Sequence, residues 1–202
     1  MPDIVDLKPD DIPAAGAVLA RSLFEDGLAR HMYPDDEERK VRTPWHFSAM
    51  VRYGVLFGRV LTTAGNPRGV AIWLPPGETA MTDSRIAAAG LDAAPAVLGD
   101  EAFGRLMTAM AHIEPYREQD MPPQHWFLAL VGVDPDYSGK GIGNALLRPI
   151  LEQADADGLP CYLETAEERN VAYYEMHRFE TLRHGALPDT AVEYWTMQRM
   201  PA

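Results

Sequence analysis

The segment from residue 126 to residue 143 constrains the fold more than any other part of the chain. It begins with a mostly apolar run, Trp126 to Val133, which predicts a buried strand. Asp134 and Pro135 end this strand, because proline cannot donate a ladder hydrogen bond and aspartate favours turns. Three alternating glycines follow. The apolar residues between 142 and 154 then recur on one face, as in a half-buried helix.

The glycine-rich turn predicts a site for an anion. Without Cβ atoms the backbone can approach a ligand closely, and the first free N–H groups of the following helix point at it. A plain turn would need one glycine, whereas this turn has three, at positions 139, 141 and 143. Two common nucleotide loops are excluded. A Walker A loop would need glycine at Asp134 and serine or threonine at Gly141, and a dinucleotide fingerprint would need glycine at Asn144 or Leu146.

The same turn, Ser138-Gly139-Lys140-Gly141-Ile142-Gly143, resembles the acetyl-CoA loop of the GNAT acyltransferases, [QR]-x-x-G-x-[GA], with Ser138 in place of the leading Gln or Arg. A second segment, Leu163-Glu164-Thr165 followed by Asn170 to Phe179, is similar to the family's L-E-T … N-x-x-x-Y-E-x-x-G-F. Arg178 stands where glycine is usual. Residues 125–180 carry the strong likeness, which is greatest to the puromycin N-acetyltransferase branch.

The resemblance implies an α/β fold. The GNAT sheet is mixed, mostly antiparallel, splayed between its fourth and fifth strands and flanked by helices. Residues 1–202 would form one N-acetyltransferase domain. Residues 78–124 exceed a minimal acyltransferase core, and we expect them to form a helical insertion between the third and fourth strands, over the acceptor cleft.

Local patterns predict the remaining elements. We expect strands at 4–7, 59–64, 69–74, 160–164, 179–183 and 192–198, and helices at 11–24, 36–57, 83–89, 100–116 and 170–177. Gly65-Asn66-Pro67 is typical of a hairpin turn. Thr43-Pro44 predicts a restart within the 36–57 helix, because threonine caps a helix well and proline is tolerated at its first position.

Acetyl-CoA is the co-substrate that the resemblance implies. Its pantetheine arm would bond the backbone of the fourth strand at Val131, Gly132 and Val133, with a bulge at Gly132. Backbone amides of the loop would hold the pyrophosphate, and Lys140 would partly replace the missing Gln or Arg contact. The full expected set also includes Ser138, Gly139, Gly141, Ile142, Gly143, Asn144 and Asn170.

The resemblance also assigns the chemistry. Tyr174 would donate a proton to the departing thiolate, while its neighbour Tyr173 would pack away from the cofactor. A protonated amine must lose a proton before it attacks, and Glu164 is the first candidate for the base. It is equally well interpreted as a structural carboxylate or a group that recognises a cation. His112 and His125 are alternative bases.

The expected acceptor is a primary amine of a small, antibiotic-like or aromatic molecule, which attacks the thioester directly. Trp126 and Glu164 would face it from the two central strands, and Tyr33 and His112 would complete its pocket. Two other functions stay open: a non-catalytic acyl-CoA-binding regulatory module, favoured by Ser138 and Arg178, and a protein or peptide N-acetyltransferase.

Composition narrows the partners further. The net charge of −12 argues against nucleic acid, which needs Lys and Arg at its phosphates, and would attract a cationic amine. The sequence contains neither a membrane-spanning apolar run nor a secretory signal at its start. A lone Cys161 suits a reducing cytoplasm. No His, Cys and Asp cluster has the spacing of metal ligands. A homodimer is compatible with these features.

Overall fold

A seven-stranded sheet organises the molecule, which is a computed structural model describing residues 2–202. The strands follow the order β1-β2-β3-β4-β5-β7-β6, and all neighbours are antiparallel except β4 and β5. This confirms the expected α/β class with a mixed, mostly antiparallel sheet. The strands are β1 (Ile4–Asp6), β2 (Arg59–Thr63), β3 (Gly69–Leu74), β4 (Trp126–Val133), β5 (Cys161–Thr165), β6 (Glu180–Ala186) and β7 (Glu193–Arg199).

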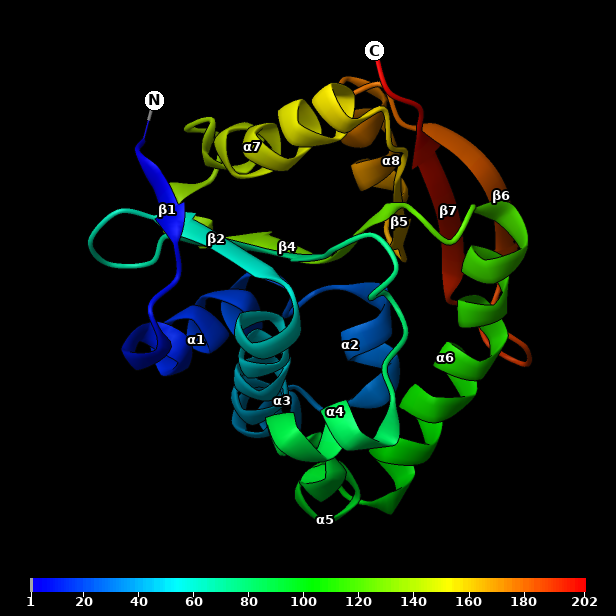
Figure 1. The fold of residues 1–202 in the computed structure, drawn as a ribbon. Helices are drawn as coiled ribbons and strands as arrows, with labels where there is room; N and C mark the ends of the chain where they lie inside the picture. Colours follow the sequence, from blue (N-terminus) through cyan, green and yellow to red (C-terminus); the bar gives the residue numbers. More distant parts are fainter. Residues whose placement is uncertain (1) are drawn as a thin grey trace.

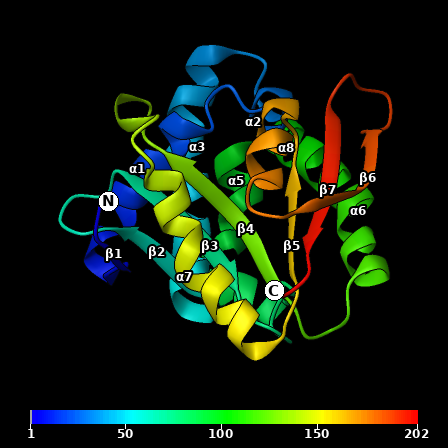
Figure 2. The ribbon, with the colours of Figure 1, turned by 90° about the horizontal axis from the view of Figure 1, so that it is seen from above.

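The centre of the sheet opens where β4 and β5 part. The two strands pair only from Trp126 to Leu128 and from Cys161 to Leu163. Beyond that point they diverge, and α8 lies near the wide end of the gap (Figure 2). The backbone groups along the unpaired part of β4 are therefore available to a ligand on the β5 side. The splayed sheet that the sequence predicted is confirmed.

Helices cover the two faces of the sheet unequally (Figure 1). The upper face carries α7 (Ile142–Asp157) and α8 (Glu168–Glu175), and the lower face carries most of the others, with α6 running beside β6 and β7. These lower elements are α1 (Ile12–Ser22), α2 (Gly27–Met32), α3 (Asp36–Phe57), α4 (Asp83–Ala89), α5 (Ala94–Leu98) and α6 (Asp100–Asp120). Three 3₁₀ turns complete the chain: η1 (Pro9–Asp11), η2 (Leu91–Ala93) and η3 (Pro135–Tyr137).

Helix α7 holds the upper layer in place through one apolar face. Leu146, Leu147 and Ile150 are fully buried, and the helix packs against β2, β3 and β4. Each such side chain contributes about 1.5–3 kcal/mol relative to exposure. The helix that follows the glycine loop is thus fixed to the sheet, and so is the loop at its beginning.

The predicted bulge at Gly132 is wrong. The register shift in β4 falls opposite Ile72 and Trp73, where Ala129 is the extra residue between Leu128 and Leu130. Gly132 pairs regularly with Val70, and a Cβ built there would lie 2.6 Å from the Ser22 Oγ atom of α1. Glycine is required at 132 for the close approach of α1.

Three helix predictions also need correction. Helix α3 does not restart at Pro44. It begins at its cap Asp35, whose side chain accepts the Glu38 N–H at 2.8 Å, and it continues through the proline. Helix α6 likewise runs past Pro115 to Asp120, and the short α2 was not predicted. Tertiary packing overrides the local proline signal in both long helices.

Candidate functional site: a cavity at the split of the sheet

A cavity of about 730 Å³ opens where β4 leaves β5. Its walls come from the end of β4, the glycine loop, the start of α7, the connection between α1 and α2, and α8. The lining residues are Arg21, Ser22, Leu23, Glu25, Asp26, Val131, Gly132, Val133, Pro135, Tyr137, Ser138, Gly139, Gly141, Ile142, Gly143, Asn144, Glu167, Arg169, Asn170, Tyr173 and Tyr174. The structure thus brings together every cofactor-binding residue expected from the sequence except Lys140.

Gly139 and Gly141 shape the loop for close contact with a ligand. Both have left-handed backbones, with φ of 73° and 75°, which side chains of other residues rarely adopt. A Cβ built at either position would meet no atom within 4 Å, so the space beside the loop is open. Helix α7 begins immediately afterwards, at Ile142, and its first N–H groups lack partners within the helix. This bare backbone cradle fits a pyrophosphate.

Lys140 does not line the cavity, and its contact in place of the missing Gln or Arg stays a prediction. Its ammonium group donates to the Asp136 carbonyl at 2.9 Å and lies 4.8 Å from the centre of the Tyr137 ring. It is therefore held on the outside of the loop. A different cation, Arg21 of α1, lines the cavity and pairs with Asp134 at 2.5 Å. Sequence reasoning missed Arg21 because it lies 113 residues from its partner.

Both tyrosines of α8 line the cavity, so the prediction that only one of them could face it is wrong. The Tyr173 hydroxyl is buried without a hydrogen-bond partner among the described residues. A Cβ at Gly143 would lie 2.7 Å from it. Burial raises the pKa of Tyr173 to about 12. Tyr174 is 6% exposed, and burial, with smaller effects of Tyr173 and the Asp26 charge, raises its pKa further. Both hydroxyls therefore stay protonated at neutral pH and can donate.

A sequence model of the acetyltransferase (GNAT) family matches residues 70–179, more than half of the chain. This match contains the glycine loop, the splayed strands and both tyrosines. The chain belongs to the GNAT family. It is therefore an acetyl-CoA-dependent N-acetyltransferase.

Individual relatives agree with this family assignment. The chain is 28% identical over 176 residues to the uncharacterized N-acetyltransferase C550.08 of Schizosaccharomyces pombe, covering 84% of this chain and 70% of that protein. A histone acetyltransferase HPA2 and related acetyltransferase from Corynebacterium glutamicum has the same fold, with a TM-score of 0.71, 20% identity and coverage of 100% and 97%. Arylalkylamine N-acetyltransferase 2 from Aedes aegypti matches with a TM-score of 0.66, 14% identity and coverage of 99% of each chain.

Glu164 of this GNAT protein lies on the lower face, just past the last residue of β5 that pairs with β4. Its carboxylate is 3.7 Å from the Arg117 guanidinium of α6, which lies 4.2 Å from the centre of the Phe127 ring. Burial raises the pKa of Glu164 to about 7, with Arg117 opposing the shift and Glu114 adding to it. The Oε1 atom is buried without a hydrogen-bond partner among the described residues. Glu164 is therefore a carboxylate that titrates near neutral pH.

The other predicted acceptor residues do not gather around Glu164. Side chains alternate between the two faces along β4. Trp126 therefore packs on the upper face with α7, whereas its neighbour Phe127 points to the lower face. Tyr33 is fully buried, and its hydroxyl donates to the Leu98 carbonyl at 3.2 Å. His112 packs against Tyr116 and Tyr194, beside β7. The prediction that these residues share one pocket with Glu164 is wrong.

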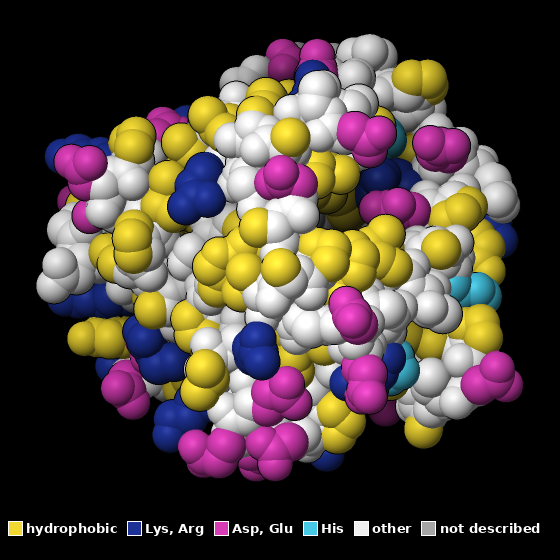
Figure 3. Space-filling view, turned by 90° about the horizontal axis from the view of Figure 1, so that it is seen from below, with side chains coloured by type: hydrophobic (Ala, Val, Ile, Leu, Met, Phe, Trp, Pro, Cys, Tyr) yellow, Lys and Arg dark blue, Asp and Glu magenta, His cyan; other side chains and the backbone are white. Residues whose placement is uncertain are grey.

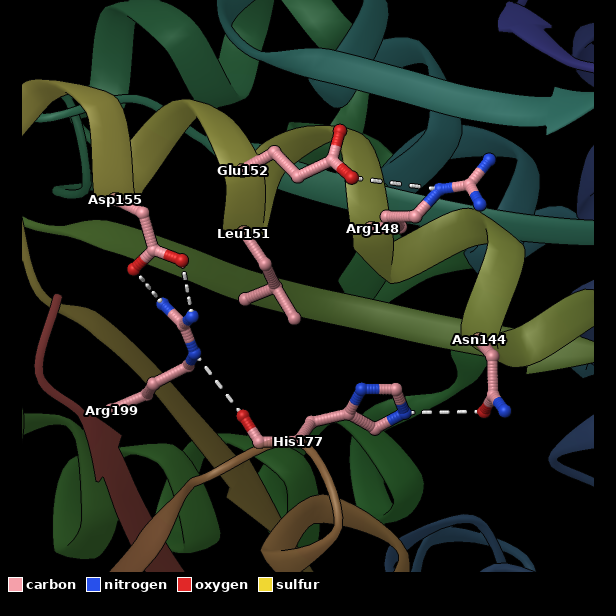
Figure 4. A pocket seen from close by; sticks show the side chains of 7 residues that line it. All are labelled: Asn144, Arg148, Leu151, Glu152, Asp155, His177 and Arg199. Atoms are coloured by element: carbon pink, nitrogen blue, oxygen red, sulfur yellow. Dashed lines mark hydrogen bonds and ion pairs between the residues drawn. The ribbon is translucent and has the colours of Figure 1, made fainter. Parts of the chain in front are cut away.

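A second, smaller cavity of about 260 Å³ lies beside the first, and Asn144 lines both. In Figure 4 the His177 ring meets the Asn144 side chain, with 3.1 Å between His177 Nε2 and Asn144 Oδ1. Arg199 closes the other end through two hydrogen bonds to Asp155, of 2.8 and 2.6 Å. This cavity lies between α7 and the residues His177 and Arg199, so it extends the polar surface beyond the glycine loop.

Several lining residues carry no motif that a sequence could reveal. Ser22 reaches the cavity from the end of α1, Asp26 from the α1–α2 connection, and Glu167 from the cap of α8. Within residues 2–202, no group of three or more His, Cys, Asp or Glu side chains could hold a metal ion. In the same range, no helix has the length and apolar character needed to cross a membrane.

Proposed function

We propose that this protein acetylates the primary amine of a small aromatic molecule, with Tyr174 as the general acid. The observation that carries the proposal is the single cavity that joins the glycine loop, the gap between β4 and β5, and Tyr174. A thioester lying along the unpaired edge of β4 would place its reacting end near the split of the sheet. The phosphates would remain at the start of α7.

The side chains of the cavity support direct transfer. The amine nitrogen attacks the thioester carbon, the new C–N bond forms, and the C–S bond breaks. Tyr174 then supplies a proton to the departing sulfur, and its raised pKa means that the hydroxyl still carries this proton when the thiolate forms beside it. The thioester is already activated, so no nucleophilic side chain is needed.

The acceptor would approach from the lower face. Glu164, Arg117 and Phe127 lie together there, beneath the split and against α6. Seen from this side, the surface is hollowed. Hydrophobic side chains lie inside the hollow, and basic and acidic side chains lie at its edge (Figure 3). An aromatic surface beside a carboxylate suits an aromatic cation, and the net charge of −12 favours its approach.

Two other functions compete with this proposal. A non-catalytic acyl-CoA module would not need two protonated tyrosines in the cofactor cavity. A protein acetyltransferase needs an open groove for a peptide, whereas here α4, α5 and α6 enclose the lower side of the sheet. The names of the structural relatives include both an arylalkylamine and a histone acetyltransferase, so the enclosure by these helices is the feature that favours a small acceptor.

The experiment is a panel of acceptors assayed for CoA thiol release. The panel contains arylalkylamines, short aliphatic amines, and peptides with free N-termini or lysines. The proposal expects arylalkylamines to be acetylated fastest, with acetyl-CoA raising the Tm of the protein. Faster transfer to the peptides would replace it with the protein-acetyltransferase function. A raised Tm without transfer to any acceptor would support the regulatory module instead.

A further inference from the structure

Asp26 occupies an unusual place for a helix cap. It is the N-cap of α2, and its Oδ1 atom accepts the Leu28 N–H at 3.0 Å. Caps are commonly exposed, but Asp26 is half-buried and lines the cavity that contains Tyr174 and the end of β4. The carboxylate thus has a structural role and also belongs to the wall of the site.

The groups around Asp26 come from α2 and α8. Glu167 lies beside it and accepts the Gly27 N–H at 2.8 Å, while Arg169 pairs with Glu167 at 3.2 Å. Burial, opposed by the Leu28 N–H and assisted by the charge of Glu167, raises the pKa of Asp26 to about 6, and Arg169 opposes the shift. The charge of Asp26 in turn helps to raise the pKa of Tyr174. A carboxylate and a phenol are therefore electrostatically linked across one cavity.

We propose that Asp26 is the group that removes the proton from the incoming ammonium. This inference rests on the proposed function and adds a residue to it. The ammonium gives one proton to the Asp26 carboxylate, and the neutral amine then attacks the thioester carbon. When the C–S bond breaks, Tyr174 protonates the sulfur, and the proton left on nitrogen returns to the Tyr174 oxygen. Asp26 releases its proton to water, so the reaction yields one amide, one thiol and one proton.

Other carboxylates near the site are less suited to this step. Three carboxylates line the cavity: Glu25, Asp26 and Glu167. Glu25 is exposed, and the two oxygens of Glu167 are engaged by the Gly27 N–H and by Arg169. Glu164 does not line the cavity and faces Arg117. Glu164 then binds the cation on the lower face, and Asp26 accepts its proton.

The test is Asp26→Asn, because asparagine caps a helix as well as aspartate but takes up no proton at these pH values. The wild-type kcat for the fastest amine of the panel should rise with pH until about pH 6 and then flatten at this group's pKa. In Asp26→Asn that limb should disappear, and kcat should fall by about 100-fold or more. Above pH 6 the Tm should rise, because ionising a carboxylate with this raised pKa costs stability that asparagine does not cost, and the stabilisation by acetyl-CoA should stay at its wild-type value.

Asp35→Asn is the matched control, since Asp35 caps α3 in the same way, is exposed and lies outside the cavity. Its pH profile should equal that of wild type. If Asp26→Asn does not fold, Asp26→Ser retains the cap and gives the same readout. A wild-type profile in a folded Asp26 variant would overturn this inference alone, whereas a wild-type enzyme that acetylates no amine would overturn the proposed function with it.

Discussion

The upper and lower sides of the gap between β4 and β5 are built in different ways. On the upper side, one continuous segment supplies a strand, a glycine loop and the start of α7, and it presents mainly backbone to the cavity. On the lower side, Glu164 of β5 meets Arg117 of α6 and Phe127 of β4, which lie far apart in the sequence. The upper side can be shared by a family because it depends on backbone shape, whereas the lower side can differ between members because it depends on individual side chains.

The largest effect is expected from a substitution in the glycine loop of the upper side. Gly141→Val places a branched side chain at a φ of 75°, in the open space beside the loop. Acetyl-CoA should no longer raise the Tm, and turnover should be lost, because the backbone amides can no longer reach the phosphates. Thermal melts with and without acetyl-CoA measure this.

Gly65→Val is the control for that substitution. Gly65 has a φ of 77° and no atom within 4 Å of an added Cβ, but it lies in the β2–β3 turn, away from the cavity. Both variants should lose about 1–2 kcal/mol from backbone strain. Only Gly65→Val should keep the acetyl-CoA effect. Equal effects at the two positions would mean that the loop does not hold the co-substrate.

Tyr174→Phe tests whether the chemistry belongs to the upper side. Loss of the hydroxyl should lower kcat by about 100-fold if it is the general acid, with the affinity for acetyl-CoA unchanged. Tyr173→Phe removes the hydroxyl beside Gly143 and should leave kcat within a few-fold of wild type. Steady-state kinetics with both substrates separate these outcomes. A larger loss at Tyr173 would assign the acid to that residue instead.

Glu164→Gln tests the lower side separately. The acceptor KM should rise about tenfold, since a charged contact is lost, while the KM for acetyl-CoA stays the same. In the wild type, the acceptor KM should fall as pH rises through about 7, because the carboxylate that binds the cation forms there. The variant should lack this dependence. An equal rise in both KM values would show that the two sides are not independent.

The pH dependence of stability gives a second readout for the same variant. The folded-state pKa of Glu164 is raised to about 7 from 4.5, so ionising it costs stability as pH rises between these two values. Glu164→Gln should remove this decline from Tm measured across the range. If Glu164→Gln both removes the fall of Tm with pH and raises the acceptor KM, the two effects arise from the same buried carboxylate.

The same comparison explains what the sequence could predict. Local patterns and family resemblance predicted the splayed sheet, the glycine loop, the positions of the two tyrosines and both ends of β4. These features could be predicted because contiguous residues determine the backbone geometry there. Arg117 and Asp26 were missed, since each reaches its site from a distant helix or cap that carries no motif. Trp126 was assigned to the wrong pocket because the sequence predicted the ends of β4 but not which side chains point to each face of the sheet.

The smallest expected effect concerns Arg178, one of the two positions, with Ser138, where the family pattern on the upper side is broken. Arg178, in the turn between α8 and β6, has a φ of 67°, as the glycine usual there would. Its side chain is exposed. Arg178→Gly removes a strain of about 1–2 kcal/mol. The greater freedom of glycine in the unfolded chain offsets about 0.5–1 kcal/mol of this gain. The free energy of unfolding from urea titration should therefore rise by up to about 1 kcal/mol, with kcat and both KM values unchanged. A fall in stability would show that the Arg178 side chain makes contacts whose free energy exceeds the strain of its backbone. The upper side would then also depend on an individual side chain, as the lower side does.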